Sequence, residues 1–348
     1  LYILIDFFKK QGEILENPSK ESHEGKPLLK HIRECLSLSS KILCNLGIAD
    51  DLSRQICSYL CIVHDIGKLD PRWQLGKRKR IAHAKRGGEL LWKYRDRLEK
   101  LLNLPREYAS FLALATLKHH SSLFINQLRP EEIAISSELS SVFSGNKIMA
   151  ITLADLIGIF KLSDIISALN MDYELVLSQF KLRSDISERL IDEIRRWAEQ
   201  KCSFDSIKYE TQSKLASSKV KHLIIAAPTG WGKTALALLR IQYMNPTKVF
   251  YVLPTITAIK DFEEKLRRVF GSEYVGEYFY FADVEYLLRK EEPEKTVYPI
   301  DLYRYFIPKI MLTTIDQVLF TTLQFGKYHL RRFNFRRALL VFDEFHLL

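Results

Sequence analysis

Cysteine is scarce in this 348-residue sequence, and its spacing excludes several kinds of site. No two cysteines form a CxxC pair or a zinc-ribbon spacing; the five are Cys35, Cys44, Cys57, Cys61 and Cys202. Reduced, mostly buried thiols in a cytosolic protein are the simplest interpretation. We therefore expect Cys57 and Cys61 to be packed in a core and not to bind metal.

The signals of a membrane or secreted protein are also missing. No run approaches the roughly 18 consecutive apolar residues of a transmembrane helix, and no charged segment followed by a cleavable apolar segment opens the chain. Internal repeats and low-complexity tracts are not found either. We expect no membrane partner and a cytoplasmic location.

Acidic residues are outnumbered by basic ones. The chain has 52 Lys and Arg against 42 Asp and Glu, which gives a net charge of +10. Local concentrations lie at residues 77–80, 331–332 and 336–337. This charge favours a polyanionic partner such as nucleic acid, although a solvated basic surface is the ordinary alternative in lysine-rich chains.

Strand signals are rare in the first half of the chain, and the change of pattern near the middle predicts two domains. Residues 28–170 carry apolar side chains at helical spacing, and a charged helical connector follows over residues 172–210. Beyond it, strand-like runs at 220–226, 248–253 and 338–342 alternate with helices at 235–244 and 259–269. We predict a multidomain protein with an all-α domain at 1–171 and a parallel-sheet α/β domain at 211–348.

A phosphate-binding loop lies between a predicted strand and a predicted helix. It consists of Thr229, Gly230, Trp231, Gly232, Lys233 and Thr234. Backbone N–H groups of such a loop surround phosphates, while Lys233 reaches the β and γ oxygens and Thr234 binds Mg²⁺. The sequence therefore predicts binding of ATP and Mg²⁺.

Two carboxylates at the end of the last apolar run fit this prediction. Asp343 would hold Mg²⁺, and Glu344 would orient or activate the attacking water. His346 would couple the nucleotide state to the nucleic-acid side. Gln212, 18 residues before Gly230, is either an adenine contact or a plain surface residue.

Polar residues interrupt an apolar helical run at Cys61-Ile62-Val63-His64-Asp65-Ile66-Gly67-Lys68. Burying an imidazole, a carboxylate and an ammonium is costly unless a metal ion and a phosphate pair with them. On a continuous helix, His64 and Asp65 would reach one ion, and Lys68 would lie one turn on, over His64. The pair alone proves little, because a satisfied core histidine is the commoner case.

Several motifs together resemble the first RecA-like domain of superfamily-two DExH helicases. They are the phosphate loop, Pro254-Thr255, the run from Thr313 to Leu319, and Asp343-Glu344-Phe345-His346. The Thr-Ile-Asp-Gln run is similar to that of the CRISPR-associated Cas-three helicase-nucleases, in which an HD nuclease domain precedes the motor. The resemblance implies an all-α HD domain followed by a RecA-like domain, truncated here after the Asp-Glu-Phe-His motif.

The resemblance also implies a metal site in the first domain. His31, His64, Asp65 and a late aspartate would bind one ion, and Asp65 would bridge to a second ion held by His83, His119 and His120. The late aspartate is Asp164 or Asp155, which would face opposite ways on one continuous helix; Asp164 matches the family's run better. Lys68 would steady a phosphate oxygen or developing charge. One or two ions of Mn, Fe, Co or Ni would suit such ligands.

The activity implied is a metal-dependent single-stranded DNA nuclease coupled to an ATP-driven helicase or translocase, as in type I CRISPR interference. The partners implied are single-stranded DNA and a crRNA-guided type I surveillance complex. Two alternatives stay open: an HD phosphohydrolase of nucleotides or signalling phosphoesters, and a non-nucleolytic nucleic-acid remodelling ATPase with a structural HD domain. The chain stops directly after a motif, so we expect a fragment that binds ATP poorly, hardly hydrolyses it and does not unwind duplex by itself.

Overall fold

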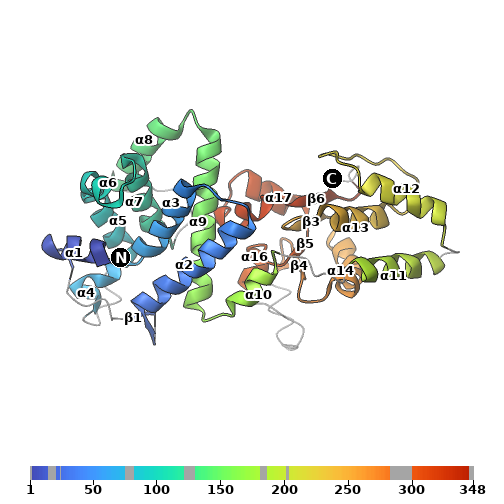
Figure 1. The fold of residues 1–348 in the computed structure, drawn as a ribbon, viewed down its shortest axis with the longest axis horizontal. Coiled ribbons are helices and arrows are strands. Elements are labelled where there is room, and N and C mark those ends of the chain that lie inside the picture. Colours follow the sequence, from blue (N-terminus) through green and yellow to red (C-terminus); the bar gives the residue numbers. More distant parts are fainter. Residues whose placement is uncertain are drawn as a thin grey trace. The chain divides into compact units, whose positions relative to one another are not determined.

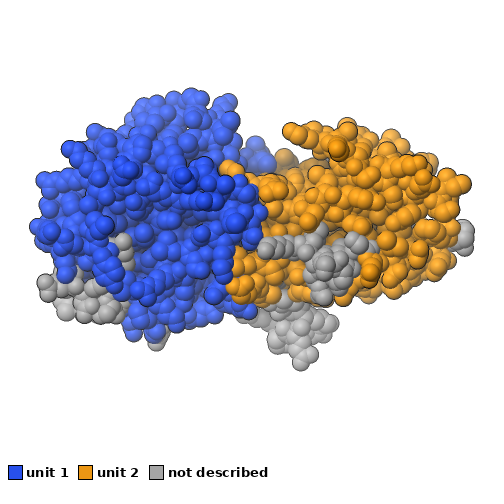
Figure 2. Space-filling model, viewed as in Figure 1, with its two compact units in different colours: residues 1–173, 321–333 blue, residues 174–320, 334–348 orange. Residues whose placement is uncertain are grey.

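The computed structural model describes residues 2–14, 21–23, 25–74, 82–120, 130–180, 186–200, 204–282 and 300–344. Two compact units divide the chain, one of residues 1–173 with 321–333 and one of residues 174–320 with 334–348 (Figure 2). Among the described residues, no helix combines the length and apolarity needed to cross a membrane. Cys202, the basic run 77–80 and His346 lie outside the described residues.

The first unit is helical, as the sequence predicts (Figure 1). Its elements are α1 (Tyr2–Lys10), β1 (Glu21–His23), β2 (Lys26–Pro27), α2 (Leu28–Asn45), α3 (Asp51–Val63), η1 (Ile66–Leu69), α4 (Pro71–Gln74), α5 (His83–Lys93), α6 (Arg95–Leu102), α7 (Arg106–Leu117), α8 (Pro130–Phe143), α9 (Lys147–Ala168) and α18 (His329–Arg332). Helix α9 packs against both α2 and α3. Helices α2 and α3 also pack against each other.

The helix that carries the apolar run ends earlier than expected. Asp50 caps α3 by accepting a hydrogen bond from the Ser53 backbone N–H, and the helix ends at Val63. The prediction of a continuous helix through His64 and Asp65 is therefore wrong. The chain turns into η1 because Gly67 packs directly on α5, where a Cβ would lie 2.0 Å from the His83 carbonyl oxygen.

Helix α9 meets α18 through a glycine and a buried ion pair. A Cβ on Gly158 would lie 2.0 Å from the His329 carbonyl oxygen, so only glycine allows this approach. On the same face Asp155, which is fully buried, lies 3.0 Å from the Arg332 guanidinium. Arg332 also donates to the Ile151 carbonyl at 3.1 Å. Helix α18 is thereby fixed onto α9.

We expect Arg332→Ala to destabilise the protein by about 3 kcal/mol, because it removes the guanidinium from a buried carboxylate. Urea unfolding of the variant and the wild type measures the difference. The double variant Asp155→Asn with Arg332→Ala is the control and is expected to cost less than Arg332→Ala alone, since no buried charge is left behind. A single variant as stable as the wild type would contradict the expectation.

Glu13 ties the segment after α1 to α5. Its carboxylate lies 2.7 Å from Arg86 and 2.6 Å from Lys93, and it accepts a hydrogen bond from the Tyr94 hydroxyl at 2.8 Å. The hydrogen bond from Lys93 lowers the pKa of Glu13 most, and with Tyr94 and Arg86 it outweighs burial and brings the pKa to about 2.

Because the folded pKa of Glu13 lies below its usual value of 4.5, its stabilisation is present above that value and is lost as the pH falls from 4.5 to about 2. We expect the free energy of unfolding of the wild type to exceed that of Glu13→Gln by about 1 kcal/mol at neutral pH. This difference should disappear in acid. Urea unfolding at several pH values tests this. Glu264→Gln, which removes an exposed carboxylate, should show no comparable gap.

The second unit contains a four-stranded, wholly parallel sheet in the order β4-β5-β3-β6. Its elements are α10 (Tyr173–Ser178), α11 (Ile186–Glu199), α12 (Ser206–Ala216), α13 (Lys233–Met244), β3 (Val249–Val252), α14 (Ile256–Phe270), β4 (Val275–Tyr278), α16 (Ile300–Arg304), β5 (Ile310–Thr313), α17 (Ile315–Thr322), η4 (Phe333–Phe335) and β6 (Leu339–Phe342). Strands β3, β4 and β5 are buried throughout, as expected for a parallel sheet covered by helices. The predicted α/β class is confirmed.

One predicted strand is not formed. Residues 220–226 have no strand assignment, and within the described chain no ladder pairs with them. Ile224 is 96% exposed, although the apolar run predicted a buried strand. A strand depends on a neighbouring backbone as much as on its own apolar residues, and this run has none among the described residues.

Candidate active sites

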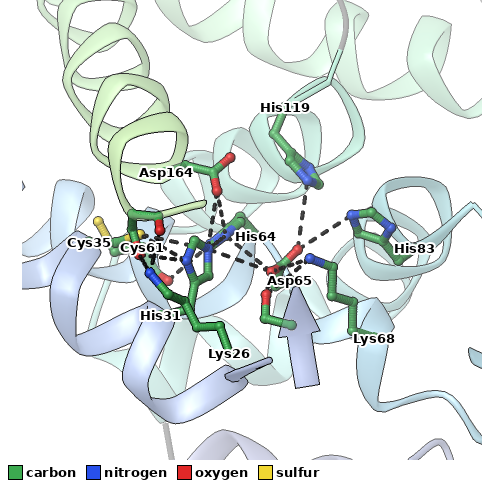
Figure 3. A network of polar contacts seen from close by, with 12 residues as sticks. Lys26, His31, Cys35, Cys61, His64, Asp65, Lys68, His83, His119 and Asp164 are labelled. Carbon is green, nitrogen blue, oxygen red and sulfur yellow. Dashed lines mark hydrogen bonds and ion pairs between the residues drawn. The ribbon is translucent and has the colours of Figure 1, made fainter. Parts of the chain in front are cut away.

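Histidines and aspartates from five helices or their ends meet inside the first unit (Figure 3). His31 lies on α2, His64 and Asp65 follow α3, His83 begins α5, His119 and His120 follow α7, and Asp164 lies on α9. All seven were predicted site residues, and the structure brings all seven together. The cluster is largely enclosed, since His31, His64, Asp65 and His119 are buried.

Hydrogen bonds from the ring nitrogens that point away from the cluster fix the orientation of two imidazoles. The Nδ1 atoms of His64 and His119 lie 3.0 and 2.6 Å from the carbonyl oxygens of Cys61 and Thr116. A carbonyl only accepts, so Nδ1 of both rings carries the proton and donates. When the ring is neutral, Nε2 of each therefore presents a lone pair toward the cluster.

His31 is oriented through a serine. Its Nδ1 lies 2.8 Å from Ser167 Oγ, and the Ser167 hydroxyl donates to Glu34 Oε2 at 2.7 Å. The serine oxygen is then the acceptor for the His31 Nδ1 proton. This hydrogen-bonded support behind an imidazole is typical of metal-ligating histidines, because it fixes the tautomer and the ring direction.

Two lone pairs face each other at the centre of the cluster. Nε2 of His31 and Nε2 of His64 are 3.2 Å apart, and both Nδ1 protons are already committed outward. Asp164 Oδ1 lies 3.1 Å from the first of these nitrogens and 3.6 Å from the second. Such an arrangement needs a proton or a cation between the nitrogens, and the mixed imidazole and carboxylate donors fit a divalent transition metal.

The two candidate late aspartates face opposite sides of α9, as their nine-residue separation predicts. Asp164 points into the histidine cluster, whereas Asp155 forms the ion pair with Arg332 on the other face. Helix α9 is continuous from Lys147 to Ala168. Of these two aspartates, only Asp164 lies within reach of His31 and His64.

Asp65 lies between two groups of histidines. Its Oδ2 is 3.5 Å from His64 Nε2, and its Oδ1 is 3.4 Å from His83 Nε2 and 3.9 Å from His119 Nε2. His120 Nε2 lies 2.8 Å from His83 Nε2. One carboxylate can therefore contact ions on both sides.

Lys68 is not where a continuous helix would put it. Its ammonium donates to Asp65 Oδ2 at 2.7 Å and to Ser22 Oγ at 3.1 Å, and the residue is buried. The prediction that Lys68 lies over His64 is wrong, because the chain leaves the helix at Val63. Lys68 instead pairs with the Asp65 carboxylate.

The carboxylates and burial shift the pKa values of the imidazoles in opposite directions. At His64 burial lowers the pKa, but the Asp65 and Asp164 carboxylates outweigh it and raise the pKa to about 9. Burial lowers the pKa of His83 to about 3 and that of His119 well below its usual value. The two carboxylates thus favour a positive charge at His64, whereas burial favours the neutral form of His83 and His119.

Two further donors were missed by the sequence argument. His23 on β1 lies beside His31 and Asp65, and Cys35 lies beside His31 and Asp164. Burial lowers the pKa of His23 to about 4. His23 precedes α2 on a very short strand without periodicity, and its only signal was a position eight residues before His31. Cys57 and Cys61 are buried, as expected for core residues.

The second unit holds a pocket of about 570 Å³ around the predicted phosphate loop. Thr229, Gly230, Gly232, Lys233, Thr234, Asp343 and Glu344 line it. Gly230 and Gly232 have φ of 81° and 93°, values that favour glycine, and α13 begins at Lys233. A helix N-terminus after a glycine loop is a ready site for phosphate.

The remaining predicted nucleotide contacts sit around this loop. Gln212 is buried and donates to the Trp231 carbonyl at 2.8 Å, so it is not a plain surface residue. Asp343 Oδ2 accepts a hydrogen bond from the Tyr251 hydroxyl at 2.9 Å, and Lys233 lies 3.8 Å from Glu344. The pocket is also lined by Phe204 and Tyr209, from the segment that leads into α12 and from α12 itself.

Parts of the sequence are similar to those of known proteins. Residues 206–348 match the DEAD/DEAH box helicase family, so the second unit contains a helicase domain of that type. A Methanocaldococcus jannaschii protein described as a CRISPR-associated nuclease/helicase Cas3 is 28% identical over 148 residues, 40% of this chain and 20% of that protein. The predicted resemblance to nuclease/helicases of the Cas3 type is thus confirmed as a similarity in sequence over part of the chain.

Solved structures share the fold of nearly all of this chain. Crystal structures of T. fusca Cas3 with ATP and with ADP align over 96% of this chain, with TM-scores of 0.59 and 0.60 and 17% identity. The chain spans about half the length of that protein, 47% and 48% in the two cases. The predicted order of a helical domain followed by a RecA-like domain is therefore confirmed.

Proposed function

We propose that this chain, a homologue of Cas3 nuclease/helicases, is a metal-dependent nuclease for single-stranded DNA that is coupled to an ATP-driven motor. The observation that carries the proposal is the carboxylate of Asp65 between two groups of inward-facing imidazoles. A phosphate loop occurs in the same chain. The net charge of +10 suits a nucleic-acid partner.

In this proposal His31, His64, Asp65 and Asp164 hold one divalent ion, and Asp65 with His83, His119 and His120 holds a second. Mn, Fe, Co and Ni all suit such ligands. A bound ion supplies a Lewis acid and a water of lowered pKa. The chain's own groups orient the site: Ser167 fixes the His31 ring, and the Cys61 and Thr116 carbonyls fix the His64 and His119 rings.

Lys68 has two tasks in the proposed reaction. It neutralises Asp65 in the free protein and would share its ammonium with a phosphate oxygen of the DNA backbone. Because backbone phosphates dominate such contacts, DNA binding should weaken as salt rises. No base contact is required for this chemistry, so cleavage should be sequence-tolerant.

For the motor, we propose that Thr229 to Lys233 surround the phosphates of ATP and that Thr234 and Asp343 hold Mg²⁺. Glu344 would orient the attacking water, and Gln212 would contact the adenine from its position against the loop. His346 would couple the nucleotide state to the nucleic acid. A crRNA-guided type I surveillance complex is the proposed docking partner, and the cytoplasm the proposed location.

Substrate choice tests the nuclease proposal. The chain is stripped with a chelator, loaded with Mn²⁺, Co²⁺ or Ni²⁺, and incubated with single-stranded DNA and, separately, with mononucleotides. We expect DNA cleavage in the wild type and none in His64→Ala. Turnover of mononucleotides alone would favour a phosphohydrolase, and equally low metal content in wild type and His64→Ala would favour a structural HD domain in a remodelling ATPase.

A further inference from the structure

The β1–β2 hairpin brings a histidine to the metal cluster that the proposed ligand set leaves out. The ring of His23 packs edge-on against that of His31, with centroids 4.7 Å apart and planes at 76°. Nε2 of His23 is buried and has no hydrogen-bond partner within the described chain. A buried ring nitrogen without a partner is costly, so its surroundings call for a ligand.

Donor atoms of three residues converge at this point. One potential ligand atom each of His23, His31 and Asp65 lies within 4.8 Å of the others. Two imidazoles and a carboxylate are a donor set that Mn²⁺, Co²⁺ and Ni²⁺ accept. A single cation between them would satisfy the buried nitrogen and the carboxylate together.

The hairpin is anchored on both sides of His23. Ser22 donates to Asp65 Oδ2 at 2.6 Å and accepts from Lys68 at 3.1 Å. Lys26 on β2 lies 2.6 Å from Glu34 and donates to the Ser167 carbonyl. The backbone that carries His23 is therefore tied to the same residues that orient the proposed ligands, which holds the ring in one place.

We propose that His23 is a further ligand of the metal ion held by His31 and Asp65. This inference rests on the proposed metal site and adds a residue to it. The β1–β2 hairpin would then supply a metal ligand in addition to its contacts with the residues around the site. Loss of His23 should weaken binding of the ion held by His31. Binding of the ion held by His83, His119 and His120 should not change.

Metal affinity tests the inference without any use of activity. The chelator-stripped chain is titrated with Co²⁺, and binding is followed by the visible spectrum of the bound ion and by metal analysis after dialysis. We expect His23→Gln to weaken one class of ion about tenfold to a hundredfold. His222→Gln, which changes an exposed histidine of the second unit, is the matched control and should bind as the wild type does.

A cysteine at the same position gives a second readout that does not depend on affinity. In His23→Cys the thiolate should add a sulfur-to-cobalt charge-transfer band to the spectrum of the wild type, because only a direct ligand can do so. The wild type keeps Cys35 near His31, so it supplies the background spectrum. Thermal unfolding of the metal-free variants checks that they fold.

The possible outcomes separate this inference from the proposed function. Wild-type Co²⁺ affinity in His23→Gln together with no new band in His23→Cys would overturn the role of His23, provided His64→Ala still loses metal. A wild type that binds no Co²⁺ would overturn the metal site itself. Weaker Co²⁺ binding in His23→Gln together with a new band in His23→Cys would support both the metal site and the role of His23 in it.

Discussion

Replacing Asp65 by asparagine is expected to lower the rate of single-stranded DNA cleavage by about a thousandfold or more. Asp65 contacts both groups of imidazoles, so its loss affects both proposed ions, whereas each histidine serves only one. The contribution of bound ions to such hydrolysis is several kcal/mol, and each 1.4 kcal/mol is a factor of ten in rate. Asparagine keeps the shape of the side chain and removes the charge.

The matched control for Asp65→Asn is Asp70→Asn. Asp70 is also buried and lies five residues on, but its carboxylate pairs with Arg72 and Arg86 and faces no histidine of the cluster. Metal analysis after dialysis should show both ions reduced in Asp65→Asn and neither reduced in Asp70→Asn. An Asp65→Asn chain that keeps its metal and its cleavage rate would exclude the bridging role.

Helical periodicity allowed much of the first unit to be predicted. The described parts of residues 28–170 are mostly helical, as expected, and the opposite directions of Asp155 and Asp164 follow from 100° per residue on a continuous helix. Which of the two meets the histidines depended on tertiary packing. Arg332, 177 residues after Asp155 in the chain, occupies the other face of α9, and no local pattern reveals such a pairing.

The errors lie where tertiary contact overrides local preference. The α3 helix ends at Val63 because the chain must turn to place Gly67 against α5. After this turn the Lys68 side chain contacts Asp65 and does not lie over His64 as expected. His23 was missed because a three-residue strand carries no periodic signal. Residues 220–226 have strand composition, but without a paired neighbour composition alone does not make a strand.

Replacing Lys233 by alanine is expected to weaken nucleotide binding by about ten- to a hundredfold. Lys233 begins α13 beside the phosphate loop, and among the described residues its ammonium lies 3.4 Å from the Ala227 carbonyl oxygen and 3.8 Å from Glu344. It is thus available to phosphate oxygens. Charge-assisted hydrogen bonds of this kind contribute about 1.5–3 kcal/mol, which corresponds to that change in affinity.

Titration with a fluorescent ATP analogue and Mg²⁺ measures the change in affinity. Lys214→Ala on α12, which removes an exposed lysine paired with Glu210, is the control and should bind as the wild type does. Equal affinity in Lys233→Ala and wild type would place the phosphates elsewhere. Metal content in the histidine cluster should be the same in all three chains, because Lys233 and Lys214 belong to the second unit and the cluster to the first. Asp65→Asn and Lys233→Ala should therefore each remove one chemistry and leave the other, which is the result expected of two separate sites in one chain.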